Sequence, residues 1–298
     1  MRSMEADMKK VVILGCENSH AGGFLKNFKG KEEFSDIEVV GVYSYDREAA
    51  KKLSDTYGVK IMESFDEAVG EVDGVIITAR HGSNHYKYAK PYIASGVPMF
   101  IDKPITENGG EAVELMRALK DAGIRFCGGS ILPLDKRLIE IARRVREEEG
   151  GKTVGGFVRA PIDIKSEYGG FYFYAQHLVE MVCAVFGYYP DYVSAAMSDK
   201  AVTAVIEYGD IHVTAHFIEK SYKYYIGRFT DKDTEMIDIS DDPADERTYT
   251  EVSEFCEMIR GGKGRESRED FIAPVFVMDA IVEAYESGRR VAVKKYCV

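Results

Sequence analysis

Short apolar runs alternate with helix-like segments along the first 127 residues of the chain. The runs lie at residues 11–15, 37–43, 73–78, 97–101 and 124–127. A continuous apolar run of this length is typical of a parallel strand that is buried on both faces. Because strands that alternate with helices form right-handed βαβ units, residues 1–127 are predicted to form a doubly wound parallel sheet, an α/β fold.

The pattern changes in residues 128–298. Residues 202–206 and 212–216 alternate between apolar and polar side chains, and Gly209 lies between them in a segment typical of a hairpin turn. Such alternation predicts antiparallel strands with one covered face and one more polar face. We therefore expect a second, α+β domain at 128–298, with a largely antiparallel open sheet that helices cover on one side.

Charge and cysteine content exclude several classes of protein. The formal net charge of −11 argues against nucleic acid or an anionic membrane surface as a partner. The five cysteines are scattered without a C-x-x-C pair, so we expect reduced thiols in a cytoplasmic protein. The apolar run at 11–15 is too short for a signal peptide or a membrane span, and residues 1–9 are expected to form a disordered leader.

One lysine follows the fourth apolar run. The string Ile101-Asp102-Lys103-Pro104 places Lys103 at the carboxyl end of a predicted strand, where open α/β sheets bind their ligands. Asp102 can hold the lysine ammonium in place, and Pro104 fixes the direction in which the chain leaves. The alternative is a solvated lysine in a loop.

Four pieces of the sequence occur in a characteristic order. They are the run 11–15 with its turn, the run 75–78 followed by His85, the string Asp102-Lys103-Pro104 that begins 17 positions after His85, and residues 169–187 around His177. Their order and spacing resemble the Gfo/Idh/MocA family, the glucose-fructose oxidoreductase and inositol dehydrogenase group. In that family the third piece is a Glu-Lys-Pro motif and the fourth is a glycine-led Asp-x-x-x-His helix motif.

The resemblance implies an NAD(P)-dependent oxidoreductase that transfers a hydride between a nicotinamide cofactor and a sugar, a cyclitol or a related polyol. It implies a dinucleotide-binding Rossmann domain at 1–127 and a substrate-binding and oligomerisation domain at 128–298. By the same resemblance, Lys103 and His177 are the catalytic residues that reach the reacting oxygen of the substrate. Histidine titrates near neutrality and suits general acid/base chemistry, while a lysine can stabilise a developing alkoxide.

The resemblance also implies the residues that contact the two small molecules. The expected cofactor contacts are Gly15, Asn18, Ser19, His20, Ser44, Asp46, Arg47, Thr78, His85, Asp102 and Lys103. The expected substrate contacts are Asp163, Tyr172, Tyr174 and His177. The cofactor is NAD or NADP: Ser44 with Arg47 would favour the 2′-phosphate of NADP, whereas Asp46 would favour the ribose hydroxyls of NAD.

The family resemblance further implies a homodimer or homotetramer. Alternating apolar positions support association through the open face of the second sheet. These positions are Val202, Ala204, Ile206, Val213, Ala215 and Phe217.

The chain departs from the dinucleotide fingerprint G-x-G-x-x-G. Counted from Gly15, the second and third glycines are replaced by Glu17 and His20. A glutamate beside the pyrophosphate adds bulk and like charge, so either it turns away, or the phosphates sit further out, or the site is lost. We therefore expect weakened cofactor binding, and tighter binding when glycine replaces Glu17.

A second departure lies beside His177, because Phe173 occupies the aspartate position of the helix motif. Asp163 and Glu180 are the carboxylates that could take over its role. The departures leave an alternative function open, a catalytically degenerate relative that binds a nucleotide or a sugar as a sensor or scaffold. His81 and His85 are spaced like two zinc ligands, but no third ligand is evident, so we expect no metal site.

Overall fold

The computed structural model describes residues 8–240, 244–265 and 267–296, which fall into two compact units. The first unit comprises residues 8–102, 114–129 and 248–265, and the second comprises 103–113, 130–240, 244–247 and 267–296. Both units are therefore discontinuous, and the division into a dinucleotide-binding domain 1–127 and a substrate-binding domain 128–298 stays a prediction. Cys297 and most of the expected leader lie outside the described residues, and Lys9 already begins a strand.

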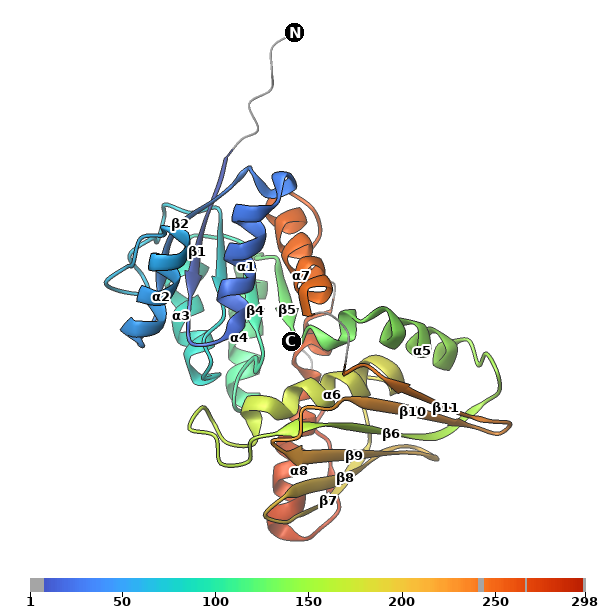
Figure 1. Cartoon of the computed structure of the whole chain (residues 1–298). Coiled ribbons are helices and arrows are strands. Elements are labelled where there is room, and N and C mark those ends of the chain that lie inside the picture. Colours follow the sequence, from blue (N-terminus) through green and yellow to red (C-terminus); the bar gives the residue numbers. More distant parts are fainter. Residues whose placement is uncertain (1–7, 241–243, 266, 297–298) are drawn as a thin grey trace. The chain divides into compact units, whose positions relative to one another are not determined.

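A parallel sheet of five strands forms the centre of the first unit (Figure 1). Its strands are β1 (Lys9–Leu14), β2 (Ile37–Tyr43), β3 (Gly74–Ile77), β4 (Met99–Asp102) and β5 (Phe126–Gly129), in the order β2-β1-β3-β4-β5. All neighbouring pairs are parallel, which confirms the predicted doubly wound sheet. In this order the winding reverses between β1 and β3, and such sheets bind ligands at the carboxyl ends of the strands beside that reversal.

Helices follow the strands of this sheet. They are α1 (Ser19–Gly30), α2 (Arg47–Tyr57), α3 (Ser83–Ile93) and α4 (Gly109–Asp121), with a 3-10 turn at Glu32–Phe34. The sequence fixes both ends of α2. The side chain of Asp46 accepts hydrogen bonds from the first backbone N–H groups of the helix, and Gly58 ends the helix with a φ of 69°.

Helix α7 (Ala244–Ile259) joins the first unit from Thr248 onward, although it lies far away in the sequence. Figure 1 shows it in orange beside α1 in blue. The ring of Phe24 on α1 packs edge-on against Phe100 of β4 and Phe255 of α7, with ring centroids 4.9 and 6.0 Å apart. Gly23 permits the close approach of α1 to Thr248 of α7, because a Cβ at position 23 would lie 2.8 Å from the Thr248 methyl group.

A sheet of seven strands forms the second unit. Its strands are β6 (Thr153–Ile162), β7 (Tyr192–Met197), β8 (Ala201–Tyr208), β9 (Ile211–Glu219), β10 (Tyr225–Thr230), β11 (Thr234–Asp238) and β12 (Val291–Ala292), in the order β11-β10-β6-β9-β8-β7-β12. Only the pair β6 and β9 is parallel, so the expected largely antiparallel sheet is confirmed. Gly209 makes the predicted hairpin turn between β8 and β9 with a φ of 58°.

Helices cover one face of this second sheet. They are α5 (Lys136–Arg146), α6 (Tyr172–Phe186) and α8 (Arg268–Ser287), with a 3-10 turn at Leu132–Leu134. Helix α6 packs on β6 and β9, and α8 packs on β7. No helix in the described ranges is both long enough and apolar enough to cross a membrane.

The alternating apolar residues of β8 and β9 face these helices. All six have an exposed fraction of 0%: Val202, Ala204, Ile206, Val213, Ala215 and Phe217. The ring of Phe217, for example, lies 5.0 Å from that of Phe171 beside α6. Our expectation that these residues line an association surface was therefore wrong, because they form core inside the chain. Self-association itself stays a prediction.

The role of α7 in the first unit can be tested by truncating Phe255, which has an exposed fraction of 0%. We expect Phe255→Ala to lower the free energy of unfolding by about 3–5 kcal/mol, the usual cost of emptying a buried aromatic site. Glu257→Ala on the exposed side of the same helix is the control and should change it by less than about 0.5 kcal/mol. Unfolding in guanidinium chloride measures the free energy of unfolding of both variants. Equal values for the two variants would contradict this role of α7.

Candidate active site

The turn after β1 keeps the first glycine of the dinucleotide fingerprint for a steric reason. Gly15 has a φ of 96°, and a Cβ at this position would lie 2.2 Å from the backbone nitrogen of Ala79. The hydroxyl of Thr78 donates to the carbonyl oxygen of Gly15 at 2.6 Å, which holds the ends of β1 and β3 together. The turn then leads into α1, whose first residue is Ser19.

Glu17 turns away from the β1 turn toward the end of β2, so the structure selects the first of the three alternatives left open by the sequence. One carboxylate oxygen accepts a hydrogen bond from the buried hydroxyl of Ser44. The other accepts from the backbone N–H of Arg80 at 3.2 Å. A carboxylate therefore lies at the carboxyl end of β2 even though β2 and the residue after it carry none there.

The two other candidates near the end of β2 have structural partners. The carboxylate of Asp46 caps α2. The guanidinium of Arg47 donates to the carbonyl oxygen of Met62 at 2.7 Å and pairs with Glu63 at 3.2 Å. Arg47 is therefore partly neutralised and held away from Ser44 by partners of its own.

Asn18 joins three elements at this edge of the first sheet. Its side-chain oxygen accepts from the backbone N–H of His20 at 2.8 Å and so caps α1. Its side-chain nitrogen donates to the carbonyl oxygen of Thr78 at 2.8 Å and to a carboxylate oxygen of Asp102 at 3.2 Å. The imidazole of His20 lies 3.3 Å from the second oxygen of Asp102.

His85 has a structural position, since it is fully buried and its Nε2 lies 2.7 Å from the carbonyl oxygen of Ala79. It therefore supports the loop after β3. Of the expected cofactor contacts in the first unit, the structure gathers Gly15, Asn18, His20, Ser44, Thr78 and Asp102 around the carboxyl ends of the strands, and Ser19 begins the helix that follows the first turn.

Lys103 begins the second unit and lies beside α6. Its ammonium is 5.8 Å from the centre of the Phe173 ring, within the range of a cation–π contact. Phe173 and His177 are four residues apart on α6 and so share one helix face. An aromatic ring thus contacts the lysine from the position where the family pattern has an aspartate.

His177 is held by a network of buried polar groups. The hydroxyl of Ser130 lies 2.7 Å from Nδ1 of His177 and accepts from the backbone N–H of Leu132 at 3.1 Å. Glu180 accepts from the backbone N–H of Ser130 at 2.9 Å and from the side chain of Gln176 at 2.5 Å. These buried contacts fix the orientation of the imidazole, which has an exposed fraction of 7%.

The same network reaches the chain around Lys103. The side-chain oxygen of Gln176 accepts from the backbone N–H of Ile105 at 2.9 Å. Gln176 therefore connects Glu180 with the segment that carries Lys103. Because all these contacts lie within the second unit, Lys103 and His177 are positioned by one set of hydrogen bonds.

The expected substrate contacts separate into two groups. Tyr174 lies beside His177, with ring centroids 5.6 Å apart. Tyr172 points instead toward α8, where its hydroxyl donates to Asp279 at 2.7 Å, and burial followed by this carboxylate raises the pKa of the phenol. Asp163 forms a long ion pair with Lys220 at 3.9 Å. Tyr174 thus contacts His177, whereas Tyr172 and Asp163 have other partners.

Two candidate site residues, Ser130 and Glu251, were not predicted from the sequence. Ser130 directly follows β5, the last strand of the first sheet along the chain. A hydroxyl at the carboxyl end of a predicted strand was the sequence signal that could have marked it as a site residue. Glu251 lies near His20 in space but is separated from it by most of the chain, so no local pattern marks it. Glu180, by contrast, was considered as a carboxylate near His177, and the structure places it in the network that holds Ser130.

A five-stranded parallel sheet with a glycine-led β1 turn and a second, mostly antiparallel sheet define a two-part α/β fold. Residues 9–129 match the Gfo/Idh/MocA family, described as an oxidoreductase family with an NAD-binding Rossmann fold, and this match confirms the resemblance for that part of the chain. The uncharacterized oxidoreductase YhhX of Escherichia coli K12 is 22% identical over 188 residues. That alignment covers 56% of this chain and 54% of the relative, so the chain spans about half of its length.

Solved structures confirm the fold over nearly the whole chain. Scyllo-inositol dehydrogenase from Lactobacillus casei, with bound NAD(H) and scyllo-inositol, is 15% identical with a TM-score of 0.81, covering 96% of this chain and 99% of that one. A myo-inositol dehydrogenase from Corynebacterium glutamicum is 18% identical with a TM-score of 0.78, covering 97% and 100%. The WlbA dehydrogenase from Chromobacterium violaceum, in complex with NADH and UDP-GlcNAcA, is 14% identical with a TM-score of 0.79, covering 98% and 97%.

The role of Ser130 as a positioning residue can be tested without a substrate. Ser130→Ala removes the hydroxyl at Nδ1 of His177, so we expect the tautomer balance of the imidazole to change and its ring-nitrogen signals to shift in NMR spectra. Tyr172→Phe removes a hydrogen bond to Asp279 elsewhere on α6 and serves as the control, with unchanged signals. His177 signals that stay the same in both variants would show that Ser130 does not set the tautomer.

Proposed function

We propose that this protein is an NAD-dependent oxidoreductase that transfers a hydride between nicotinamide and a carbon of a sugar, a cyclitol or a related polyol. The observation that carries the proposal is the buried network that orients His177 and Lys103 along one face of α6. The dehydrogenases of similar fold, described with inositol or a nucleotide sugar, support this class of substrate.

The residues of the first unit fit a dinucleotide. The tight turn at Gly15 leads into the amino end of α1, where backbone N–H groups and the helix dipole favour a phosphate. The side chain of Glu17 leaves this turn for the end of β2, which removes the bulk and like charge that the sequence analysis placed beside the pyrophosphate. Gly15, Asn18 and Ser19 would then hold the phosphates.

His177 is suited to act as both base and acid. When Nδ1 carries the proton it can donate to Ser130, and Nε2 is then the basic nitrogen that accepts the proton of a substrate hydroxyl. Once Nε2 has accepted this proton, both ring nitrogens carry one, and Nε2 can return its proton to the substrate oxygen in the reverse direction while Nδ1 keeps its hydrogen bond to Ser130. Bound nicotinamide supplies the hydride acceptor or donor.

Lys103 complements this proton transfer. Its ammonium can donate a hydrogen bond to the substrate oxygen as negative charge develops there. The contact with the uncharged Phe173 ring orients the ammonium and leaves its charge intact. A carboxylate in the position of Phe173 would neutralise that charge. The loss of the family's aspartate is therefore compatible with catalysis in this chain.

The residues at the end of β2 favour NAD over NADP. In this fold a carboxylate at the end of β2 binds the ribose hydroxyls of NAD, and a basic residue there accommodates the 2′-phosphate of NADP. Glu17 supplies a carboxylate at Ser44, while Arg47 is engaged by Met62 and Glu63. We propose that Glu17 compensates in this way for the missing acid of β2.

We also propose a cytoplasmic location. The four described cysteines, Cys16, Cys127, Cys183 and Cys256, are buried free thiols. Such thiols are usual in reducing compartments.

Cofactor titration of a Glu17 variant tests the proposed preference. We expect Glu17→Gln to weaken NADH binding and to narrow the preference for NADH over NADPH by about tenfold or more, because the carboxylate both binds the ribose diol and repels the 2′-phosphate. Glu17→Gly is likewise expected to weaken NADH binding, which reverses our expectation from the sequence. Glu63→Gln, at an exposed carboxylate of the same region, is the control.

Calorimetry with NADH and NADPH gives both affinities for each variant. Tighter NADH binding by Glu17→Gln would reject the assigned role of Glu17. If the wild-type chain binds neither cofactor, the dehydrogenase proposal fails and the sensor or scaffold alternative takes its place.

Kinetics of two single variants test the chemistry once a polyol substrate is found by screening. Lys103→Met and His177→Ala should each lower kcat by about 10²–10⁴-fold, the usual size of a general acid/base contribution. The double variant should lose much less than the product of the two, since residues that act as a unit are not additive. His177→Ala should leave NADH affinity unchanged, and activity that survives both substitutions would place the chemistry elsewhere.

A further inference from the structure

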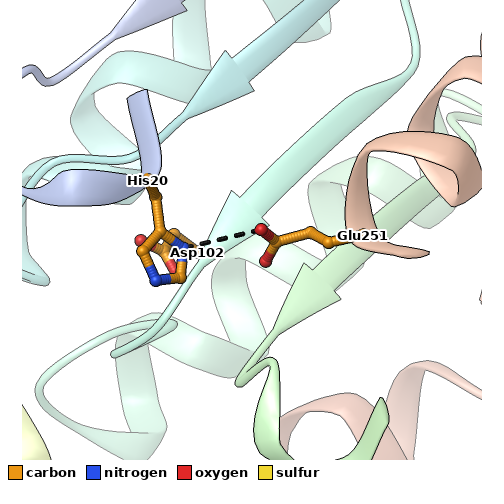
Figure 2. A group of neighbouring side chains, drawn as sticks. All are labelled: His20, Asp102 and Glu251. Atoms are coloured by element: carbon orange, nitrogen blue, oxygen red, sulfur yellow. Dashed lines mark ion pairs between the residues drawn. The ribbon is translucent and has the colours of Figure 1, made fainter. Parts of the chain in front are cut away.

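Three side chains of the first unit converge from three separate elements: His20 from the first turn of α1, Asp102 from the end of β4 and Glu251 from α7. Figure 2 shows the imidazole of His20 in front of Asp102, with a dashed line that leads to the carboxylate of Glu251. All three residue types are metal ligands, and their nearest ligand atoms lie within 4.8 Å of one another. The proposed catalytic step uses neither His20 nor Glu251.

Two of the three distances between the ligand atoms match a tetrahedral metal centre. Nδ1 of His20 lies 3.3 Å from an oxygen of Asp102 and 3.6 Å from an oxygen of Glu251. Zinc binds histidine nitrogen and carboxylate oxygen at about 2.0–2.2 Å, which places two tetrahedral ligands about 3.3–3.6 Å apart. The distances from His20 to both carboxylates are therefore those expected around a bound zinc ion, and the two carboxylate oxygens lie within 4.8 Å of each other.

Burial and charge favour a divalent cation at this place. Asp102 has an exposed fraction of 0% and Glu251 of 2%, and the side chain of His20 is 12% exposed. Two carboxylates and one imidazole thus lie together in a buried place, where ionised groups are costly unless charge or hydrogen bonds compensate them. A divalent cation bound by both carboxylates would supply such compensation.

A neighbouring side chain orients one of the ligands. Asn18 donates a hydrogen bond to Oδ2 of Asp102, which leaves Oδ1 directed at the imidazole of His20. The same asparagine fixes the backbone of His20 through its cap on α1. Hydrogen bonds of this kind hold the ligands of metal sites in place before the metal binds.

We propose that His20, Asp102 and Glu251 bind one divalent transition-metal ion, with zinc as the best match. One nitrogen and two oxygen ligands at tetrahedral spacing suit zinc, whereas calcium and magnesium prefer six or more oxygen ligands. Three protein ligands leave a fourth position for water or another small ligand, as in open zinc sites. The proposal does not rest on the dehydrogenase function.

Cobalt titration of the full-length protein tests the site. After removal of metal with a chelator, we expect Co²⁺ to bind at one equivalent per chain and to give visible absorption bands without the intense near-ultraviolet band of a thiolate ligand. Zinc should displace the cobalt and abolish the visible bands. The missing thiolate band distinguishes this site from adventitious binding at the cysteines.

Glu251→Gln removes one ligand, and its matched control is Glu257→Gln on the exposed side of the same helix. We expect Glu251→Gln to weaken Co²⁺ binding by at least about 100-fold, because even partners of ligands contribute 10–100-fold. The control should bind as the wild-type protein does. His20→Asn is the second variant, with the same expected loss, should Glu251→Gln fold poorly.

Several outcomes would overturn the site. Wild-type protein that binds no Co²⁺, or that binds it with a thiolate band, rules the proposal out. Equal Co²⁺ affinity in Glu251→Gln and Glu257→Gln also rejects it. NADH titration tests the proposed function independently of the metal site. A protein that binds NADH but no Co²⁺ would reject the metal site and leave the dehydrogenase proposal standing.

Discussion

The side-chain amide of Asn18 holds together the edge of the first sheet on which the proposed chemistry depends. It caps α1 with its oxygen, and its nitrogen reaches the end of β3 and the carboxylate at the end of β4. A single planar group therefore fixes where the first helix begins relative to two strand ends. Since helix amino ends and strand carboxyl ends are where this fold binds its ligands, the geometry of the cofactor region follows from this contact.

The contacts at this edge of the first sheet explain two departures from the dinucleotide fingerprint. Glu17 leaves the turn and provides a carboxylate at Ser44, where the strand itself has none. His20 points the other way, toward Asp102 and Glu251, and Gly23 provides the close packing of α1 at Thr248. The two positions that glycine usually occupies thus carry side chains with partners at the ends of β2 and β4, and Gly23 lies three residues after His20 where α1 meets α7.

The fold was predictable because its signals are local. Apolar runs such as 11–15 and alternating segments such as 202–206 report their own burial, and both sheets formed as expected. The alternating pattern does not say which face of a sheet is covered, so the apolar residues of β8 and β9 were assigned to the wrong side. The contact of α7 with α1 joins segments more than 200 residues apart, and no local pattern encodes it. For the same reason Glu251 could not be found, and the sequence analysis expected no metal site. His177 and Lys103 were found through their motifs, but the hydrogen bonds of Ser130 and Gln176 depend on tertiary packing.

The discontinuity of the first unit has a consequence for the order of events on the ribosome. Residues 8–102 and 114–129 emerge early, but Phe255 and the rest of α7 emerge only after the second sheet has been synthesised. Until then the ring of Phe24 lacks Phe255, which packs edge-on against it in the finished protein. Completion of the first unit therefore waits for α7, although most of that unit is synthesised before residue 130.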